Sequence, residues 1–187
     1  MGFGKPEFVT DLFLNLLMTP GDLLPHRGDV LFIPGGLVHA IGGGCRLYEV
    51  QQTSDTTWRL HDWNRVDPKT GQPRPLHERE GLAAIDWSLP PPRLLRGIPP
   101  TDAGSPGSPI VDCAHFRFSV ISVSAPATLP SDGESCRILF AEDGACAVSA
   151  DGGDPVPLAA GECALVPADA AMSLTPQPKA RLLLSTL

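Results

Sequence analysis

The sequence has few aromatic and few charged residues, and both scarcities narrow its possible partners. Phe, Trp and Tyr make up 6% of the 187 residues, and Asp, Glu, Lys and Arg make up 19%. Acidic residues outnumber basic ones by 21 to 14, which gives a formal net charge of -7. Such a chain lacks the basic surface that binds nucleic acid or an anionic membrane. We therefore expect no nucleic acid and no membrane among its partners.

Long hydrophobic runs and paired cysteine motifs are also missing. No apolar run approaches the ~20 residues of a membrane helix, and no basic-then-apolar secretory signal opens the chain. The five cysteines include no C-x-x-C pair, and an odd number cannot all pair within one chain. We expect free thiols, buried as small apolar side chains, in a cytoplasmic protein.

Turn-forming residues, by contrast, are abundant, with 21 prolines and 19 glycines. Frequent turns favour short strands over long helices, so the predicted fold class is all-β. A chain of this length buries roughly 70% of its unfolded surface, enough for one substantial domain or two small ones. Helical spacing of apolar residues predicts two short helices, over residues 5–17 and 77–87.

Strand-like runs and tight turns alternate between residues 28 and 59. Residues 30–33 precede a Pro-Gly-Gly turn, and further strands are expected over 37–41 and 45–52. His39, Glu49 and Arg59 are polar groups in these strand-like surroundings, where an unpaired charge or imidazole is costly to bury. These three residues are therefore the candidate site residues.

The first strand and its turns occur a second time in the sequence. Residues 28–34, GDVLFIP, align without a gap with residues 161–167, GECALVP. Continuing this register places Met172 opposite His39. The alignment predicts that the second copy packs against a core and carries no metal.

Composition predicts three parts of the chain. Residues 88–110 are rich in Pro and Gly and form a linker between residues 1–87 and 111–187. The last part contains short strand-like runs separated by Asp-Gly turns, the pattern of a meander or jelly roll. Asp143-Gly144 and Asp151-Gly152 are each expected to separate two strands.

The order of motifs resembles a known family. Residues 28–42 read G-D-x-x-x-I-P-x-G-x-x-H-A-I-G, residues 48–63 read Y-E-x-Q-Q-x-S-D-T-T-x-R-L-x-D-W, and R-V-D-P follows. This order resembles the type I mannose-6-phosphate isomerases of the small bacterial kind, which are zinc-dependent cupin enzymes. The resemblance implies a cupin-type jelly roll. An incomplete first cupin would precede a second, smaller β-barrel or sandwich without metal ligands.

The resemblance also implies a reaction and its residues. Mannose 6-phosphate and fructose 6-phosphate would interconvert through a cis-enediol(ate), with zinc as cofactor and a phosphorylated hexose as substrate. Arg59 corresponds to the family's active-site arginine, and Glu49 to a pocket acid that acts as general base or orients one. His39 corresponds to the later metal-binding histidine. The family's other ligands, a Gln, a His and a Glu, have no counterpart in this chain.

A zinc site needs three or four ligands at ~2.0–2.3 Å, so one imidazole does not hold the metal. Within this chain the remaining ligands could come only from Glu49, Gln51 and His61. A structural alternative stands beside each site assignment. His39 can be an ordinary histidine, Glu49 can pair with a neighbouring cation, and Arg59 can pair with Asp55 or Asp62 to brace a loop.

The residues around Arg59 are assigned structural roles. Asp55, Thr56 and Thr57 are expected to shape the loop that positions Arg59. The tryptophans, Trp58, Trp63 and Trp87, are expected to lie in the core.

Three interpretations of the whole chain remain open. It is an isomerase or part of a longer one, a catalytically inactive cupin-derived sugar-binding or regulatory module, or a protein whose true start lies upstream of Met1. The missing ligands discriminate among them, because a chain without them should bind zinc weakly. Sheets that lack their preceding strands have open edges, which predicts a homodimer.

Overall fold

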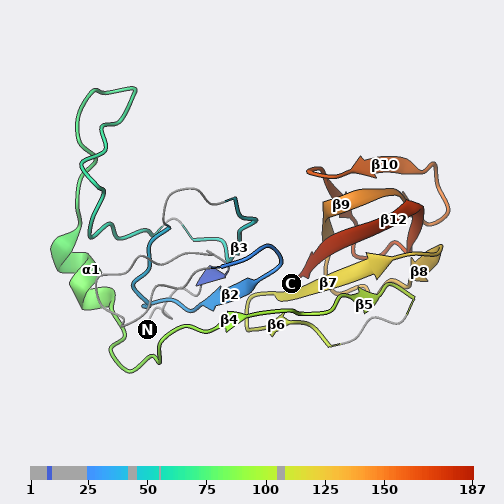
Figure 1. The fold of residues 1–187 in the computed structure, drawn as a ribbon, viewed down its shortest axis with the longest axis horizontal. Helices are drawn as coiled ribbons and strands as arrows, with labels where there is room; N and C mark the ends of the chain where they lie inside the picture. Colours follow the sequence, from blue (N-terminus) through green and yellow to red (C-terminus); the bar gives the residue numbers. More distant parts are fainter. Residues whose placement is uncertain (1–7, 10–24, 42–45, 55, 105–107) are drawn as a thin grey trace. The chain divides into compact units, whose positions relative to one another are not determined.

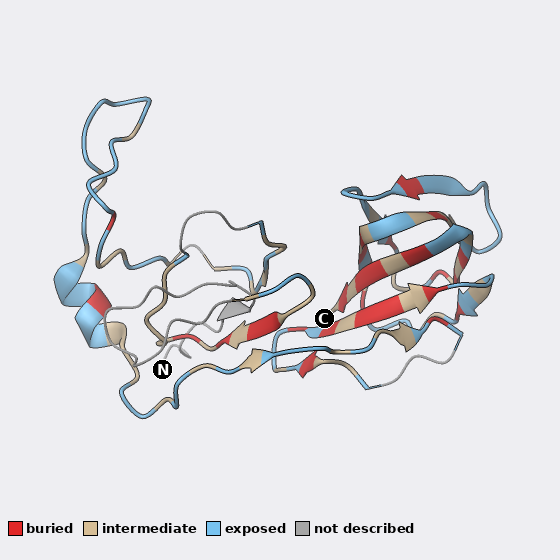
Figure 2. Ribbon diagram, in the orientation of Figure 1, coloured by how far each residue is buried: buried red, intermediate tan, exposed pale blue. Residues whose placement is uncertain are grey.

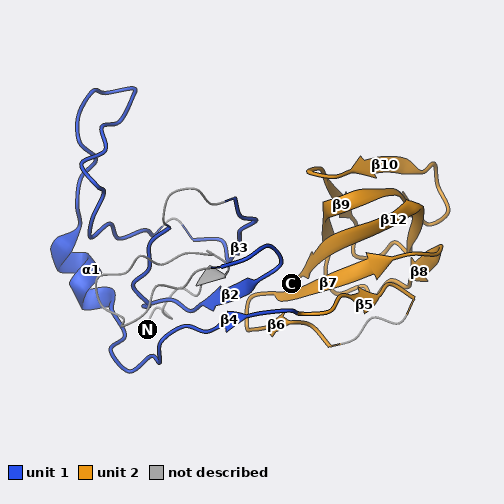
Figure 3. Ribbon diagram, viewed as in Figure 1, with its two compact units in different colours: residues 1–97 blue, residues 98–187 orange. Residues whose placement is uncertain are grey.

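The computed structural model describes residues 8–9, 25–41, 46–54, 56–104 and 108–187 of the chain. The chain divides into two compact units, Met1–Gly97 and Ile98–Leu187 (Figure 3). The boundary falls within the segment expected to be a linker. The two are called the N-terminal and C-terminal units below.

The N-terminal unit contains a four-stranded sheet in the order β3-β1-β2-β4 (Figure 1). Its strands are short: β1 is Phe8–Val9, β2 Val30–Ile33, β3 Val50–Gln51 and β4 Leu94–Leu95. All neighbouring strands are antiparallel, and β4 pairs with β2 from within the proline-rich segment. The unit's helix, α1, spans Glu78–Ala84.

One of the two expected helices is corrected by the structure. Within the predicted helix over residues 5–17, Phe8 and Val9 form strand β1 instead, because both pair with β2 and with β3. Sheet pairing here overrides the helical spacing of the apolar residues. The rest of that predicted helix lies outside the described residues. The second predicted helix is confirmed as α1.

Two expected strands in this unit are shorter in the structure or missing. Residues 37–41 form no strand, because the chain turns at Pro34, whose carbonyl oxygen accepts a hydrogen bond from Leu37 N at 3.2 Å. In the expected strand over 45–52, residues 46–49 are irregular and β3 covers Val50–Gln51. Residue 45 lies outside the described residues.

The C-terminal unit is an eight-stranded sheet system (Figure 1). Its main path runs β10-β9-β12-β7-β5, and β11 pairs with β9, β6 with β7, and β8 with β12. All these pairs are antiparallel except β5 with β7. The strands are β5 Thr101–Asp102, β6 Val111–Asp112, β7 Arg117–Val123, β8 Ala127–Leu129, β9 Arg137–Ala150, β10 Val156–Ala159, β11 Cys163–Val166 and β12 Met172–Thr186.

Strands β9 and β12 are longer than the sequence predicts. The Asp143-Gly144 turn separates no strands, because β9 continues through it and pairs with β12 on both sides. The register between them shifts between Pro176 and Ala180, where Gly144 has a φ of 73° and pairs with Ala180. Gly144 therefore marks a bulge, a position that favours glycine. The Asp151-Gly152 turn, by contrast, follows the end of β9 as expected.

The core of the C-terminal unit lies between its long strands (Figure 2). Leu139, Ile121 and Leu182 are fully buried at its centre. The cluster consists of Ala103, Ile121, Val123, Leu129, Leu139, Ala141, Cys146, Val148, Leu158, Val166, Ala170, Met172, Leu174, Ala180 and Leu182. The buried guanidinium of Arg137 donates to the carbonyl oxygens of Leu129, Pro130 and Ala170, and so fixes two segments to β9: the end of β8 and the turn before β12.

The repeat predicted from the sequence is confirmed by matching local structure. Gly28 and Gly161 have φ values of 87° and 91°, and β2 and β11 begin two residues after them. Asp29 N donates to His26 O at 3.1 Å, and the equivalent Glu162 N donates to Ala159 O at 3.0 Å.

The acidic side chains of the two copies also close the same local turn. The Asp29 carboxylate accepts from His26 N at 2.8 Å, and the Glu162 carboxylate accepts from Ala159 N at 2.7 Å. Met172, which the register places opposite His39, is fully buried. The second copy therefore packs as expected.

Two further expectations concern cysteines and membranes. The described cysteines are free thiols, but of these only Cys146 is buried as expected. Cys113 and Cys136 are half-buried, and Cys163 is exposed on the outer side of β11. Among the described residues, no helix combines the length and apolarity that crossing a bilayer requires.

Candidate functional site

The backbone of Arg59 is paired with His77. Arg59 N donates to His77 Nδ1 at 3.1 Å, and His77 N donates to Arg59 O at 2.8 Å. Because Nδ1 accepts a hydrogen bond, it carries a lone pair and no proton in this arrangement. The two residues are thus joined by one backbone and one side-chain hydrogen bond across 18 positions of sequence.

The side chain of Arg59 is held at two points. Its Nη1 donates to Pro75 O at 3.3 Å, and its Nε lies 3.9 Å from Asp62 Oδ1. The Arg59 side chain is 24% exposed, so part of the guanidinium remains open to solvent. The structure therefore contains the Arg59–Asp62 pair that would brace a loop, and it also leaves the Arg59 guanidinium partly accessible to solvent.

Asp62 is a buried carboxylate that binds a second arginine, Arg74, more closely. Arg74 Nε donates to Asp62 Oδ2 at 2.7 Å, and Arg74 Nη2 donates to the other oxygen, Oδ1. A fork-to-fork pair of this kind is stronger than a single charged hydrogen bond. The Arg74 hydrogen bond lowers the pKa of Asp62 below its ordinary value, and Asp62 raises the pKa of Arg74. Asp62 is therefore ionised at neutral pH.

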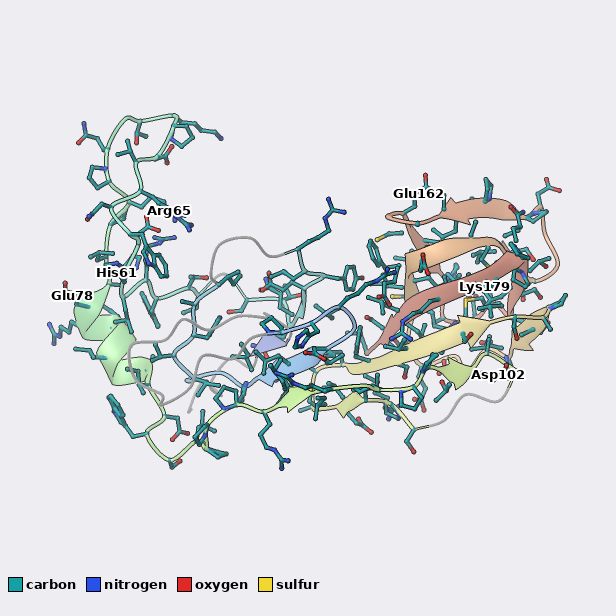
Figure 4. The ribbon with its side chains drawn as sticks, viewed as in Figure 1. His61, Arg65, Glu78, Asp102, Glu162 and Lys179 are labelled. Atoms are coloured by element: carbon teal, nitrogen blue, oxygen red, sulfur yellow. The ribbon has the colours of Figure 1, made fainter. Side chains whose placement is uncertain are left out.

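The segment between Arg59 and His77 folds back on itself like a hairpin. Val66 and Pro73 form a β-bridge, and Asp67 N donates to Gln72 O at 2.9 Å. Figure 4 shows His61 and Arg65 on this segment and Glu78 on α1, which follows it. The fold-back brings Asp62 and Arg74, which are 12 positions apart, into contact.

Helix α1 packs against the residue that follows Arg59, and its C-terminal end lies against the turn that precedes His39. A Cβ on Gly81 of α1 would lie 2.6 Å from Leu60 Cδ2, so the helix packs closely against the residue after Arg59. Just beyond the helix, Asp86 N donates to Gly36 O at 2.9 Å. Gly36 has a φ of 88°, and a Cβ there would lie 3.1 Å from Ala84 O. One short helix therefore packs against both segments.

His39 has one ring nitrogen bound to the backbone. Its Nδ1 lies 3.0 Å from Leu37 O, and a carbonyl oxygen can only accept, so Nδ1 carries the proton. Nε2 then carries the lone pair. Metal-binding histidines commonly show this arrangement, in which the second nitrogen donates to a backbone carbonyl.

Glu49 lies on the exposed side of its segment. Glu49 and Gln51 are exposed, whereas Tyr48, Val50 and Gln52 are half-buried, as alternation along a strand predicts. No hydrogen bond or ion pair between described residues joins His39, Glu49 and Arg59 to one another.

The loop before Arg59 is described only in part. Thr56 is half-buried, and its backbone N donates to Ser54 Oγ at 3.2 Å, whereas Thr57 is exposed. Asp55 lies outside the described residues.

The expectation that the tryptophans lie in the core is wrong. Trp58, Trp63 and Trp87 are 44%, 52% and 71% exposed. Trp58 packs edge-on against His77 at 5.6 Å, and Trp63 packs edge-on against His61 at 5.1 Å. These rings cover polar side chains of the hairpin-like segment, because that segment projects from the sheet and offers no apolar core.

Zinc requires more ligands than the described part of the chain brings together. Across the described stretches, no three His, Cys, Asp or Glu side chains gather closely enough to hold a metal ion. His39 fits as one ligand by its ring orientation, but His61 and Glu49 do not complete a set with it. The described residues alone do not form the zinc site that the family resemblance implies.

Sequence patterns did not identify His77 and Pro75 as partners of Arg59, or Arg74 as the partner of Asp62. The one available signal is the Lys-Thr-Gly-Gln stretch at residues 69–72, whose composition favours a turn. A turn there brings the chain back on itself, but the register that places Asp62 against Arg74 and Arg59 against His77 comes from the structure.

Comparisons with known proteins return mannose-6-phosphate isomerases among the similar sequences. No protein-family model matches the sequence. The chain is 35% identical over 103 residues to mannose-6-phosphate isomerase ManA of Bacillus subtilis, covering 54% of this chain and 32% of that protein. It is 40% identical over 63 residues to the mannose-6-phosphate isomerase of Streptococcus mutans, covering 34% and 20%. These matches span about a third of each relative or less.

A solved structure supports the fold. The crystal structure of mannose 6-phosphate isomerase from Bacillus subtilis matches 83% of this chain and 48% of its own, with a TM-score of 0.66 and 24% identity. The chain has an all-β fold of the cupin type, as the sequence predicts. Within that class, it resembles the mannose-6-phosphate isomerases over part of their length.

Proposed function

We propose that this chain contributes to a mannose-6-phosphate isomerase, with Arg59 as the charge-stabilising residue of the active site. The observation that carries the proposal is the 35% identity over 103 residues to a relative named for that activity. The partly exposed guanidinium of Arg59, fixed by Pro75 and Asp62, supports it.

The reaction moves one carbon-bound proton. A base removes the proton from C2 of the open-chain aldose, the C–H electron pair forms a C1–C2 double bond, and the carbonyl oxygen becomes an enediolate oxygen. Returning the carbon-bound proton to C1, while the O2 proton moves to O1, gives the ketose. Arg59 stabilises the negative charge of the enediolate, because a preorganised cation lowers the free energy of that state. Glu49 is the candidate base in this proposal.

Zinc belongs to the proposal as the family's cofactor, with His39 as one ligand through Nε2. The remaining ligands are not among the described residues. We extend the proposal to a cytoplasmic location, since Cys113, Cys136 and Cys146 are free thiols that suit a reducing compartment.

The test is a coupled assay for fructose 6-phosphate formation, with metal content measured on the same protein. We expect Arg59→Lys to lower kcat by about 10²–10³, because lysine lacks the planar fork of arginine. Arg181→Lys is the matched control, since Arg181 also binds a carboxylate, Glu142, but lies in the C-terminal unit. Equal losses in both variants would contradict the proposal.

A sugar-phosphate-binding module without turnover is the second candidate. It is favoured by the way Arg59 is held by protein groups alone, which suffices for binding an anion. This candidate predicts binding of mannose 6-phosphate by calorimetry, weakened in Arg59→Lys, with no formation of fructose 6-phosphate. Turnover by the wild-type chain would exclude it.

A further inference from the structure

Asp62 is a buried carboxylate, and two arginines share it. Arg74 donates to both of its oxygens, whereas Arg59 Nε lies 3.9 Å from Oδ1, too far for a good hydrogen bond. The carboxylate thus binds Arg74 directly and only faces Arg59.

The charges of this trio leave one positive charge uncompensated. Asp62 contributes one negative charge, and Arg59 and Arg74 contribute two positive ones. Arg65, which also acts on Asp62, and Asp67, which also acts on Arg74, add one charge of each sign and leave the balance unchanged. Because Arg74 forms the closer pair, the uncompensated charge belongs to Arg59. A direct two-point pair with Asp62 would instead have neutralised Arg59.

We propose that Asp62, held in place by Arg74, is a positioning residue for Arg59, which it orients without neutralising it. The hairpin-like segment supplies every part of this arrangement: Pro75 O fixes Nη1, Asp62 faces Nε, and His77 fixes the backbone. The catalytic consequence rests on the proposed function, whereas the orientation of Arg59 does not.

A merely structural ion pair makes a different prediction. If Asp62 only braces the hairpin-like segment, Asp62→Asn should lower stability and leave the ordering of the Arg59 side chain unchanged. If Asp62 positions Arg59, the isosteric change should free the guanidinium even where the variant stays folded.

The experiment is ¹⁵N NMR of the arginine guanidinium groups in the full chain. The Arg59 Nε signal is assigned by its disappearance in Arg59→Lys. In the wild type we expect slow rotation and slow proton exchange at Arg59 Nε. In Asp62→Asn we expect both to approach those of free arginine.

Arg74→Gln is the second variant. Its side chain is 37% exposed, so the change should be tolerated even if Asp62→Asn does not fold. We expect Arg74→Gln to let Asp62 pair directly with Arg59, which keeps Arg59 ordered but neutralises it. The matched control is Glu142→Gln, which should free Arg181 and leave Arg59 unchanged.

In the isomerase assay we expect Asp62→Asn to lower kcat by about 10–100-fold, because small misplacements of a catalytic group are costly. Unchanged Arg59 dynamics in Asp62→Asn would overturn the positioning role. If that variant is unfolded, an unchanged affinity for inorganic phosphate in Arg74→Gln would overturn it, because Arg59 should there be ordered but neutralised. Absence of turnover in the wild type would overturn the proposed function alone, since the NMR result decides the positioning role separately.

Discussion

The two units of this chain differ in what they bury. In the N-terminal unit the buried apolar residues among those described are Val30, Leu31 and Ile33, while all the others lie in the C-terminal unit. The polar groups differ as well. Buried Arg137 in the C-terminal unit binds only backbone carbonyls, whereas buried Asp62 in the N-terminal unit binds arginine side chains.

The repeated turn and strand, residues 28–34 and 161–167, has different surroundings in the two units. The same turn and strand occur at Gly28–Ile33 and Gly161–Val166, with matching hydrogen bonds. In the second copy the chain continues to Met172, which is fully buried. In the first copy it continues to His39, whose Nδ1 donates to Leu37 O and whose Nε2 carries the lone pair. The C-terminal copy provides packing, and the N-terminal copy presents polar side chains.

The largest expected effect comes from the core of the C-terminal unit. Leu182→Ala removes a fully buried side chain from the main cluster, and we expect it to lower the free energy of unfolding by about 3–5 kcal/mol. Leu31→Ala in the N-terminal unit should cost less, about 2–3 kcal/mol, because fewer buried neighbours surround it.

Tryptophan fluorescence separates these two effects, since all three tryptophans lie in residues 1–97. Denaturant unfolding of Leu182→Ala should shift the circular dichroism transition more than the fluorescence transition. Leu31→Ala should show the reverse order. Identical shifts of both signals in both variants would contradict the expected difference between the two units.

A smaller loss in the free energy of unfolding is expected at Gly144 of β9, which pairs with Ala180 immediately after the extra residues of β12. Gly144 has a φ of 73°, and a Cβ there would collide with the backbone oxygen of Lys179. Gly144→Ala should therefore cost about 1–3 kcal/mol, because backbone cannot move aside as a side-chain end can. Gly152→Ala is the control: Gly152 has a similar φ of 70° but no atom within 4 Å of the added Cβ. A loss in Gly152→Ala as large as in Gly144→Ala would rule out the collision.

In the N-terminal unit, His77 should matter through one hydrogen bond. His77→Ala removes the acceptor for Arg59 N and should cost about 1 kcal/mol. His77→Asn offers Oδ1 in a similar place and should restore most of that loss. The measurement is thermal unfolding followed by fluorescence. Equal destabilisation by both variants would show that ring packing against Trp58, rather than the hydrogen bond, is what His77 contributes.

The smallest expected effect is the loss, at low pH, of the stability that ionised Asp62 contributes. The Arg74 hydrogen bond holds the pKa of Asp62 below 3.8, so its stabilisation is present above that value and lost as pH falls through the lowered pKa. The stability difference between wild type and Asp62→Asn should therefore shrink between neutral pH and about pH 3.

Asp132 provides the comparison in the C-terminal unit, where a hydrogen bond from Glu134 N lowers its pKa in the same direction. Asp132→Asn should change the acid-induced unfolding curve measured by circular dichroism and leave the curve measured by tryptophan fluorescence unchanged. A pH-independent difference for Asp62→Asn would contradict the ionised Arg74–Asp62 pair.

Sequence patterns predicted most of the fold but misjudged where strands end. The Asp-Gly pair at 143–144 has the same turn chemistry as the pair at 151–152, yet one lies inside β9 and the other follows it. Turn chemistry reports which backbone angles are accessible, whereas the partner strand β12 decides whether pairing continues. Phe8 and Val9 show the same limit, because β2 and β3 made them a strand.

The candidate site was predicted in part. The motif around Arg59 was found, but its partners Arg74, Pro75 and His77 come from the far side of a turn and carry no motif of their own. The tryptophans were misassigned because their apolar character predicts burial only where a core is present.

Local patterns were enough to predict the class of fold and the repeated turn and strand, because turn chemistry, alternation and motif order are local properties. The roles of His39, Glu49 and Arg59 stay predictions. Tertiary structure alone decided that β9 and β12 each run unbroken through a bulge, and that one buried carboxylate faces two arginines. Both depend on which distant segments meet, and a carboxylate's partners and charge balance are set by those meetings rather than by its neighbours along the chain.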